Sequence, residues 1–247
     1  QAAQWAPERT IVFVAFSGEE ANRLGSRYYV KNYPPYPATK AIGNINLDTV
    51  GRLGSAPVTI FGTGSAREWP HIFRGASFVT GIEVNPVAND VGSSDQKSFL
   101  DSGIPAVQLF AQVHSDFHTP NDTLDKVDSA GLLKVAAILK EGVAYLAARP
   151  EPLTSTLTAT SSVTPSADTP TSGRQVSLGT VPDFAYPGPG VRLTDVIANS
   201  PAAHAGELKD LPSYAQQLRE MQPGEETTVT YRRNGARVTV KIGVVAR

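Results

Sequence analysis

The chain has 247 residues, enough for two ordinary domains or for one domain and a small module. Its formal net charge of −1 excludes the strong positive field of most nucleic-acid-binding proteins. Because the chain has no cysteine, disulfides and thiolate ligands are excluded, and any bound metal must be held by His and carboxylates.

The apolar stretches are too short for a membrane span. The longest one covers only residues 11–16, whereas a spanning helix needs about 20 apolar residues. The N-terminus begins Gln-Ala-Ala, without an initiator Met and without a basic-plus-apolar leader. We therefore expect a fragment or a processed form.

Strands and helices are expected to alternate in the first half of the chain. The continuous apolar run over residues 11–16 predicts a strand buried on both faces. Further strands are expected over residues 41–47, 58–61 and 105–110. Helices are expected over residues 21–33, 68–80, 98–102 and 129–148, the last with Asp128 as its N-cap. This alternation indicates an α/β domain, in which functional residues gather at the carboxyl ends of the strands.

The second half of the chain changes composition. Ser, Thr and Pro dominate residues 150–172, which predicts a flexible linker. A strand over 191–197, a turn over 199–203 and a helix over 211–221 are expected next. Asn234-Gly235 is a strong hairpin signal between strands over 227–232 and 237–244. These elements indicate a small β-rich module.

Glu19 and Glu20 follow the strand expected over residues 11–16, after Ser17 and Gly18. Adjacent carboxylates repel each other unless a cation compensates, so one could bind a metal while the other acts as general base. The alternative is a helix N-terminus, where glutamates favour the helix dipole. Asp48, after the next strand, is either a ligand or the start of a turn. These residues alone leave both interpretations open.

The four histidines are not equally good candidates for metal ligands. His114 and His118 have a spacing that suits a metal pair on a helix, but Pro120 predicts a loop there. We therefore do not expect both to bind one ion. His118 is the better ligand candidate and His114 a residue of the rim, whereas His71 and His204 are expected to be structural or exposed.

Four separated motifs together resemble the M28 metallopeptidases, the aminopeptidases with co-catalytic zinc, over residues 8–148. The motifs, in family order, are Ser17-Gly18-Glu19-Glu20, Asn46-Leu47-Asp48-Thr49-Val50-Gly51-Arg52, Ser94-Asp95 before Phe99, and Asp116-Phe117-His118-Thr119-Pro120-Asn121-Asp122. The resemblance implies an α/β fold with a zinc-aminopeptidase-like mixed sheet flanked by helices, of which the N-terminal part is missing here.

The resemblance also implies roles for individual residues. Glu19 would be the general base that activates a water held by two zinc ions. Glu20 and His118 would bind one zinc, and Asp48 the other. Asp95 would support the site from behind the ligands. The substrates would be peptides, shortened one residue at a time from the N-terminus.

This chain departs from the family pattern in several places. The family has two more ligands before the Glu-Glu pair, a His and an Asp that bridges both metals, and residues 1–18 contain neither type. The two-zinc site is therefore expected to be incomplete, and the isolated chain to have little or no activity. Gln96 stands where the family often has His, and Phe117 where Tyr is common.

The module resembles the PDZ domain that often follows M28 catalytic domains. The matching segments are residues 178–184, 190–193, 199–206, 211–214 and 223–226. Compared with that family, a strand pair of about 15 residues is expected to be deleted between Gly206 and Leu211. We therefore expect weak or no binding of peptide C-termini. The domains would be a partial peptidase domain (1–149), a linker (150–175) and a truncated PDZ-like domain (176–247).

The favoured interpretation is thus a secreted or periplasmic zinc aminopeptidase fragment with no nucleic-acid partner and no membrane span. One alternative is a non-enzymatic peptide-binding protein that uses the peptidase fold as a scaffold. A weaker one is another M28-like protein, a glutaminyl cyclase or a receptor ectodomain. The Glu19-Glu20 pair favours the hydrolase, because receptor versions do not need the base.

Overall fold

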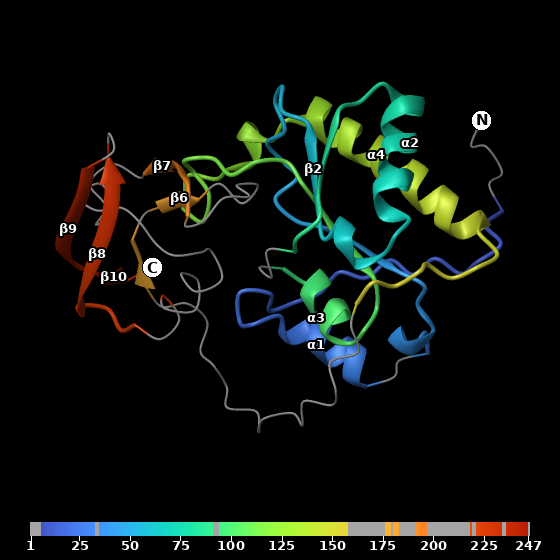
Figure 1. Ribbon diagram of the computed structural model, residues 1–247, viewed down its shortest axis with the longest axis horizontal. Coiled ribbons are helices and arrows are strands. Elements are labelled where there is room, and N and C mark those ends of the chain that lie inside the picture. Colours follow the sequence, from blue (N-terminus) through green and yellow to red (C-terminus); the bar gives the residue numbers. More distant parts are fainter. Residues whose placement is uncertain are drawn as a thin grey trace. The chain divides into compact units, whose positions relative to one another are not determined.

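The computed structural model describes residues 6–32, 35–90, 94–157, 176–178, 180–182, 191–196, 218, 221–233 and 236–246. The chain divides into two compact units (Figure 1). The first unit comprises residues 1–19, 23–112 and 127–164, and the second comprises residues 20–22, 113–126 and 165–247.

The first unit is built on a four-stranded mixed sheet. Its strands are β1 (Asn44–Leu47), β2 (Val58–Phe61), β3 (Val84–Val87) and β4 (Ala106–Phe110), in the order β1-β4-β2-β3. β1 is parallel to β4 and β2 to β3, whereas β2 and β4 are antiparallel. The predicted strands at β1, β2 and β4 are confirmed. β3 was not predicted; it contains Pro86 and lies at the edge of the sheet, where a strand tolerates proline.

Helices pack on both faces of this sheet. They are α1 (Leu24–Lys31), α2 (Trp69–Thr80), α3 (Gln96–Asp101) and α4 (Ser129–Ala148), and Figure 1 shows α2 beside α4 and α1 beside α3. Short 3-10 helices cover Ala38–Lys40, Thr63–Ser65 and Leu124–Lys126. On β4, Val107 and Leu109 join the core beneath α2 and α4, while Ala106 packs in a second cluster with Phe99 of α3. This alternation explains why every residue of β4 is buried.

The helix predictions hold with local shifts. α4 matches the expected range, and Asp128 is its N-cap as predicted, accepting the Gly131 N–H at 2.9 Å. Hydrogen bonds from Gly131 and then Gly54 hold the pKa of Asp128 below its usual value. α1 begins three residues later than expected, because Asn22 and Arg23 adopt left-handed backbone angles, with φ of 64° and 58°.

The prediction of a strand over residues 11–16 is wrong. These residues lie outside helices and strands, and Phe13 is 86% exposed. A strand exists only by pairing, and in the described part of the chain no neighbouring backbone pairs with this run. The apolar composition of residues 11–16 was therefore not sufficient to predict their structure.

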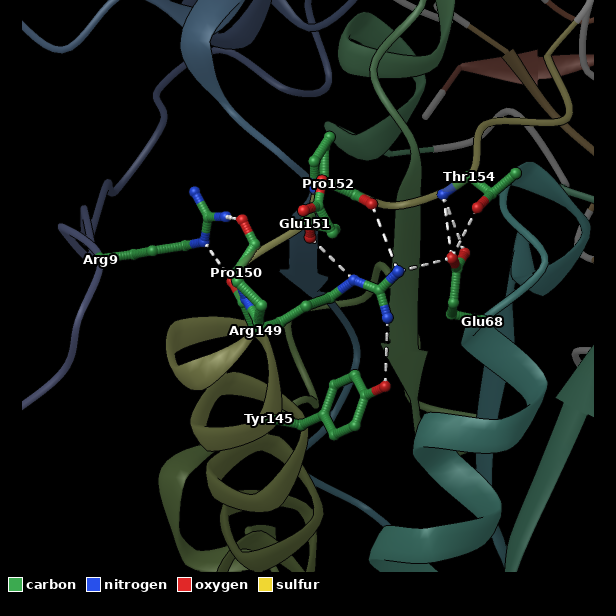
Figure 2. Close-up of polar contacts among 8 residues, drawn as sticks. All are labelled: Arg9, Glu68, Tyr145, Arg149, Pro150, Glu151, Pro152 and Thr154. Atoms are coloured by element: carbon green, nitrogen blue, oxygen red, sulfur yellow. Dashed lines mark hydrogen bonds and ion pairs between the residues drawn. The ribbon is translucent and has the colours of Figure 1, made fainter.

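The start of the expected linker is packed on the first unit rather than free. Leu153 is buried in the core, and Thr156 donates its backbone N–H to Ser65 O at 3.1 Å. Figure 2 shows how Glu68, before α2, holds this segment: its carboxylate accepts the Thr154 N–H and hydroxyl and the Arg149 Nη2. These contacts fix residues 149–156 against α2 and α4.

Replacing Glu68 with Gln is expected to lower the free energy of unfolding by about 1 kcal/mol at pH 7. Burial alone raises the pKa of Glu68, but the Thr154 hydrogen bonds and the Arg149 charge hold it below 4.5. The stabilisation is therefore full above pH 4.5 and is lost as pH falls through the lower folded pKa. Urea unfolding at pH 7 and pH 3 should show the wild-type advantage only at pH 7.

The exposed Glu83 provides the control, because Glu83→Gln removes a carboxylate on the same unit without these partners. This variant should unfold like the wild type at both pH values. If the free energies of unfolding of Glu68→Gln and the wild type differ equally at pH 7 and pH 3, the charge of Glu68 does not stabilise the packing of residues 149–156.

The module in the second unit is β-rich, as expected. Its main feature is a hairpin of β8 (Glu226–Arg233) and β9 (Ala236–Gly243), and β7 (Leu193–Val196) confirms the other predicted strand. Short strands are β5 (Val176–Ser177), β6 (Thr180–Pro182) and β10 (Val245–Ala246). A small core joins Leu178, Leu218, Val229, Ile242 and Val244.

Several expectations for the module lie outside the described residues. These are the turn over 199–203, the deletion between Gly206 and Leu211, and most of the helix over 211–221. Nor has any helix in the described ranges the length and apolarity needed to cross a membrane.

Candidate metal centre

Glu20 and His118 are brought together by the fold, although 98 residues separate them in the sequence. Glu20 Oε1 lies 2.6 Å from His118 Nε2. The His118 side chain is 31% exposed and that of Glu20 55%, so a ligand from solution can reach both. The ring of Phe117 stacks on that of His118, with centroids 3.8 Å apart. The pair that the sequence assigned to one zinc is thus adjacent in space.

Two further ion pairs hold the loop that carries His118. Lys126 Nζ lies 2.9 Å from Asp116 Oδ2, and His114 Nε2 lies 3.8 Å from Asp122 Oδ2. His114 therefore has a partner within the loop itself. The sequence analysis missed the pairing of Asp116 with Lys126, because no periodic spacing connects two residues in an irregular loop.

Asp48 and Asp95, two further candidates from the sequence, both lie in the first unit. Asp48 follows β1, and its N–H donates to Leu109 O of β4 at 3.3 Å. Asp95 is only 8% exposed, and its Oδ1 is buried without a hydrogen-bond partner in the described structure. Burial raises the pKa of Asp95, and the negative charge of Asp48 raises it further, against a hydrogen bond from Ser26. Asp95 is thus close enough to Asp48 to sense its charge.

Gln96 makes a buried amide network beside Asp95. Its Oε1 accepts the Asn46 Nδ2–H at 3.0 Å, and its Nε2 donates to Asp90 Oδ1 at 2.7 Å and to Gln108 Oε1 at 3.1 Å. Gln96 and Gln108 are almost fully buried. The network therefore ties β1, β4 and the start of α3 together next to Asp48. The sequence analysis noted Gln96 as a departure from the family pattern, but it did not predict the hydrogen-bond partners of this residue.

Backbone strain is concentrated at the candidate ligands. The non-glycine residues with positive φ in the described chain are Asn22, Arg23, Thr49 and His118. One is a candidate ligand, and the others follow Glu20 or Asp48 within three residues. A β-branched residue such as Thr49 rarely adopts φ of 53°. Such strain persists where the surroundings enforce it, as at functional sites.

The donors are of the kinds that zinc takes in proteins without cysteine, namely carboxylate oxygens and imidazole nitrogens. Within the described ranges, no group of three or more His, Asp and Glu residues could hold a metal ion. Structural and catalytic zinc sites use three or four protein ligands. The described residues therefore fit zinc in type, whereas the Glu20–His118 pair is too small a set to bind it tightly. The general-base candidate Glu19 is half-buried at the start of the turn before α1.

Comparison with known proteins gives the same family as the motifs. The chain matches the model of peptidase family M28 over residues 1–143. It resembles the solved structure of LapA from Legionella pneumophila, with 18% identity over 60% of this chain and 43% of that chain and a TM-score of 0.52, which shows a shared fold. No curated protein matches.

Two more solved structures are similar over part of their length. BSAP, a zinc aminopeptidase from Bacillus subtilis, is 21% identical over 58% of this chain and 38% of its own, with a TM-score of 0.49. An aminopeptidase from Aneurinibacillus sp. strain AM-1 is 33% identical over 56% of this chain and 33% of its own, with a TM-score of 0.46. The chain thus spans less than half the length of these proteins. Because the family model covers more than half of the chain, this protein belongs to peptidase family M28 and is by family a hydrolase.

Proposed function

We propose that this chain carries part of the catalytic site of a secreted or periplasmic zinc aminopeptidase. The observation that carries the proposal is the 2.6 Å approach of Glu20 to His118, inside the region that matches the family. The family resemblance assigns these two distant residues to one ion, and their proximity supports that assignment. Membership of peptidase family M28 supports peptides as the substrate class.

Each residue has a distinct role in the proposed reaction. Glu20 and His118 would hold one of two zinc ions and Asp48 the other, and the zinc would polarise the peptide carbonyl and acidify a water. Glu19 would accept a proton from that water and pass it to the amine that leaves. Asp95, which is buried, would support the ligands from behind, as the family resemblance implies.

On its own, the chain is expected to bind zinc weakly and to turn over no substrate. Titration calorimetry with Zn²⁺ should show fewer than two sites, and Leu-p-nitroanilide should be cleaved no faster than background. His118→Ala should weaken the residual binding about ten-fold, since it removes one of two adjacent donors. His71→Ala is the matched control, because His71 is exposed on α2. Two tightly bound zinc ions together with fast turnover would show that the chain holds a complete site.

We also propose that the domains are a partial peptidase domain (1–149), a linker (150–175) and a truncated PDZ-like module (176–247). The β8–β9 hairpin and its small core support a β-rich module. With a strand pair deleted, it would bind peptide C-termini weakly or not at all. Fluorescence titration with C-terminal peptides tests this, and micromolar affinity would contradict it.

A further inference from the structure

Arg23 has a strained backbone conformation directly before α1. Its φ of 58° and ψ of 41° lie in the left-handed region, and Asn22 before it has φ of 64°. Residues with a side chain beyond Cβ rarely adopt this region, and two in succession are rarer still. Such a conformation persists only where the surrounding contacts enforce it. The contacts of Arg23 must therefore hold it in place.

The backbone of Arg23 closes the turn that carries Glu19. Its N–H donates to the carbonyl oxygen of Glu19 at 2.7 Å, and the next two N–H groups donate to those of Gly18 and Ser17 at 2.9 Å each. The carbonyl oxygen of Arg23 accepts the hydroxyl of Ser26 at 3.3 Å. The position of Glu19 in the first unit therefore depends on where Arg23 is held.

The side chain of Arg23 reaches α3. Its Nη1 lies 3.7 Å from Oδ2 of Asp101, the last residue of α3, and the Arg23 side chain is only 18% exposed. Lys97 pairs with the same carboxylate from within α3. The hydroxyl oxygens of Ser26 and Ser98, both buried, lie 2.8 Å apart and make a second contact between α1 and α3. α3 thus provides a support for Arg23.

α3 is itself fixed to the sheet. The side chain of Gln96, at the start of α3, accepts a hydrogen bond from Asn46 of β1 and donates one to Gln108 of β4. A series of contacts therefore leads from the Glu19 turn through Arg23 and α3 to β1, the strand that Asp48 follows. One helix connects the turn of the proposed base with the strand of a proposed zinc ligand.

We propose that Arg23 is a positioning residue for Glu19. Its side chain, anchored on Asp101 of α3, would hold the left-handed turn so that Glu19 keeps a fixed place relative to the end of β1. Arg23 would act through the backbone of the turn and not on the substrate. This inference rests on the proposed function, in which Glu19 is the general base. Because a misplacement of about 1 Å can lower a rate about 100-fold, loss of the anchor should affect kcat more than stability.

Arg23→Gly is the decisive variant, because Gly adopts positive φ without strain but has no side chain to anchor. In the 247-residue chain, urea unfolding should give the variant about the wild-type stability. Hydrogen exchange measured by NMR should become about five-fold faster at the N–H groups of residues 23–25. Arg23→Lys, which keeps a cation, should restore most of this protection. Unaltered exchange at residues 23–25 in Arg23→Gly would overturn the inference.

Arg74→Gln is the matched control, because it removes an exposed cation of α2 in the same unit. This variant should leave both the stability and the exchange of residues 23–25 as in the wild type. If Arg74→Gln accelerates their exchange as much as Arg23→Gly does, the protection reflects the total charge of the unit and the inference fails.

A second measurement uses a polypeptide that joins this chain to a complete set of zinc ligands. There Arg23→Gly should lower kcat for Leu-p-nitroanilide about ten-fold and leave KM and zinc content unchanged, and Arg23→Lys should recover most of the kcat. The inference is overturned if Arg23→Gly keeps the wild-type kcat where Glu19→Gln abolishes it. If Glu19→Gln itself keeps the wild-type kcat, the proposed function fails, and the exchange rates at residues 23–25 alone decide whether Arg23 holds the turn.

Discussion

Replacing Glu19 with Gln is expected to lower kcat for Leu-p-nitroanilide about 1,000-fold in a polypeptide that joins this chain to a complete set of zinc ligands. Gln has nearly the shape of Glu and can accept a hydrogen bond, but its amide cannot take a proton from water at neutral pH. The substitution therefore removes the proposed base and leaves Glu20, the proposed zinc ligand, unchanged. Steady-state kinetics, with zinc stoichiometry measured on the same sample, separates the two effects.

The control for this prediction is Glu8→Gln, which neutralises an exposed glutamate in the same unit and should leave kcat unchanged. Glu20→Gln should behave differently from Glu19→Gln, because it removes a proposed ligand and should lower zinc content as well as kcat. If Glu19→Gln keeps most of the wild-type kcat with full zinc occupancy, Glu19 is not the base. If it loses zinc, Glu19 is a ligand rather than a base.

The elements that were predicted correctly are those whose cause is local. β2 is a short apolar run that is buried along its whole length, and α2 and α4 each combine an amphipathic pattern with a clear end signal. Gly81, with φ of 70°, ends α2, and the Asp128 side chain begins α4. Where a side chain or a glycine within a few residues decides the structure, the sequence contains enough information.

The errors concern structure that depends on distant partners. Residues 11–16 have the composition of a strand, but strand formation needs a neighbour, and the described chain provides none. β3, which was not predicted, contains Pro86, and an edge strand can do without the N–H that proline lacks. The Glu20–His118 approach could be expected from the motif resemblance but not from spacing, because only the fold determines which loops meet.

Replacing Gln96 with Leu is expected to lower the free energy of unfolding by about 3 kcal/mol. Leu has a side chain of similar size to Gln, but it offers neither a hydrogen-bond donor nor an acceptor. Gln108, which is 1% exposed, would lose its Gln96 donor, and Asn46 would keep only Ser94 as acceptor. A buried polar group left without a partner costs more than an average hydrogen bond contributes, because water cannot replace the lost contact. Urea unfolding at neutral pH measures the loss.

A matched glutamine shows whether burial is the reason for this cost. Gln112 is exposed and donates only a long 3.4 Å hydrogen bond to Leu53 O, so Gln112→Leu should change stability by less than about 0.5 kcal/mol. Equal losses for the two variants would mean that the network around Gln96 does not stabilise the sheet. If only Gln96→Leu is destabilising, the amide that replaces the family's usual His is a structural tie between β1, β4 and α3. Asp48 at the end of β1 then depends on this tie for its position, which connects the stability of the sheet to the geometry of the proposed site.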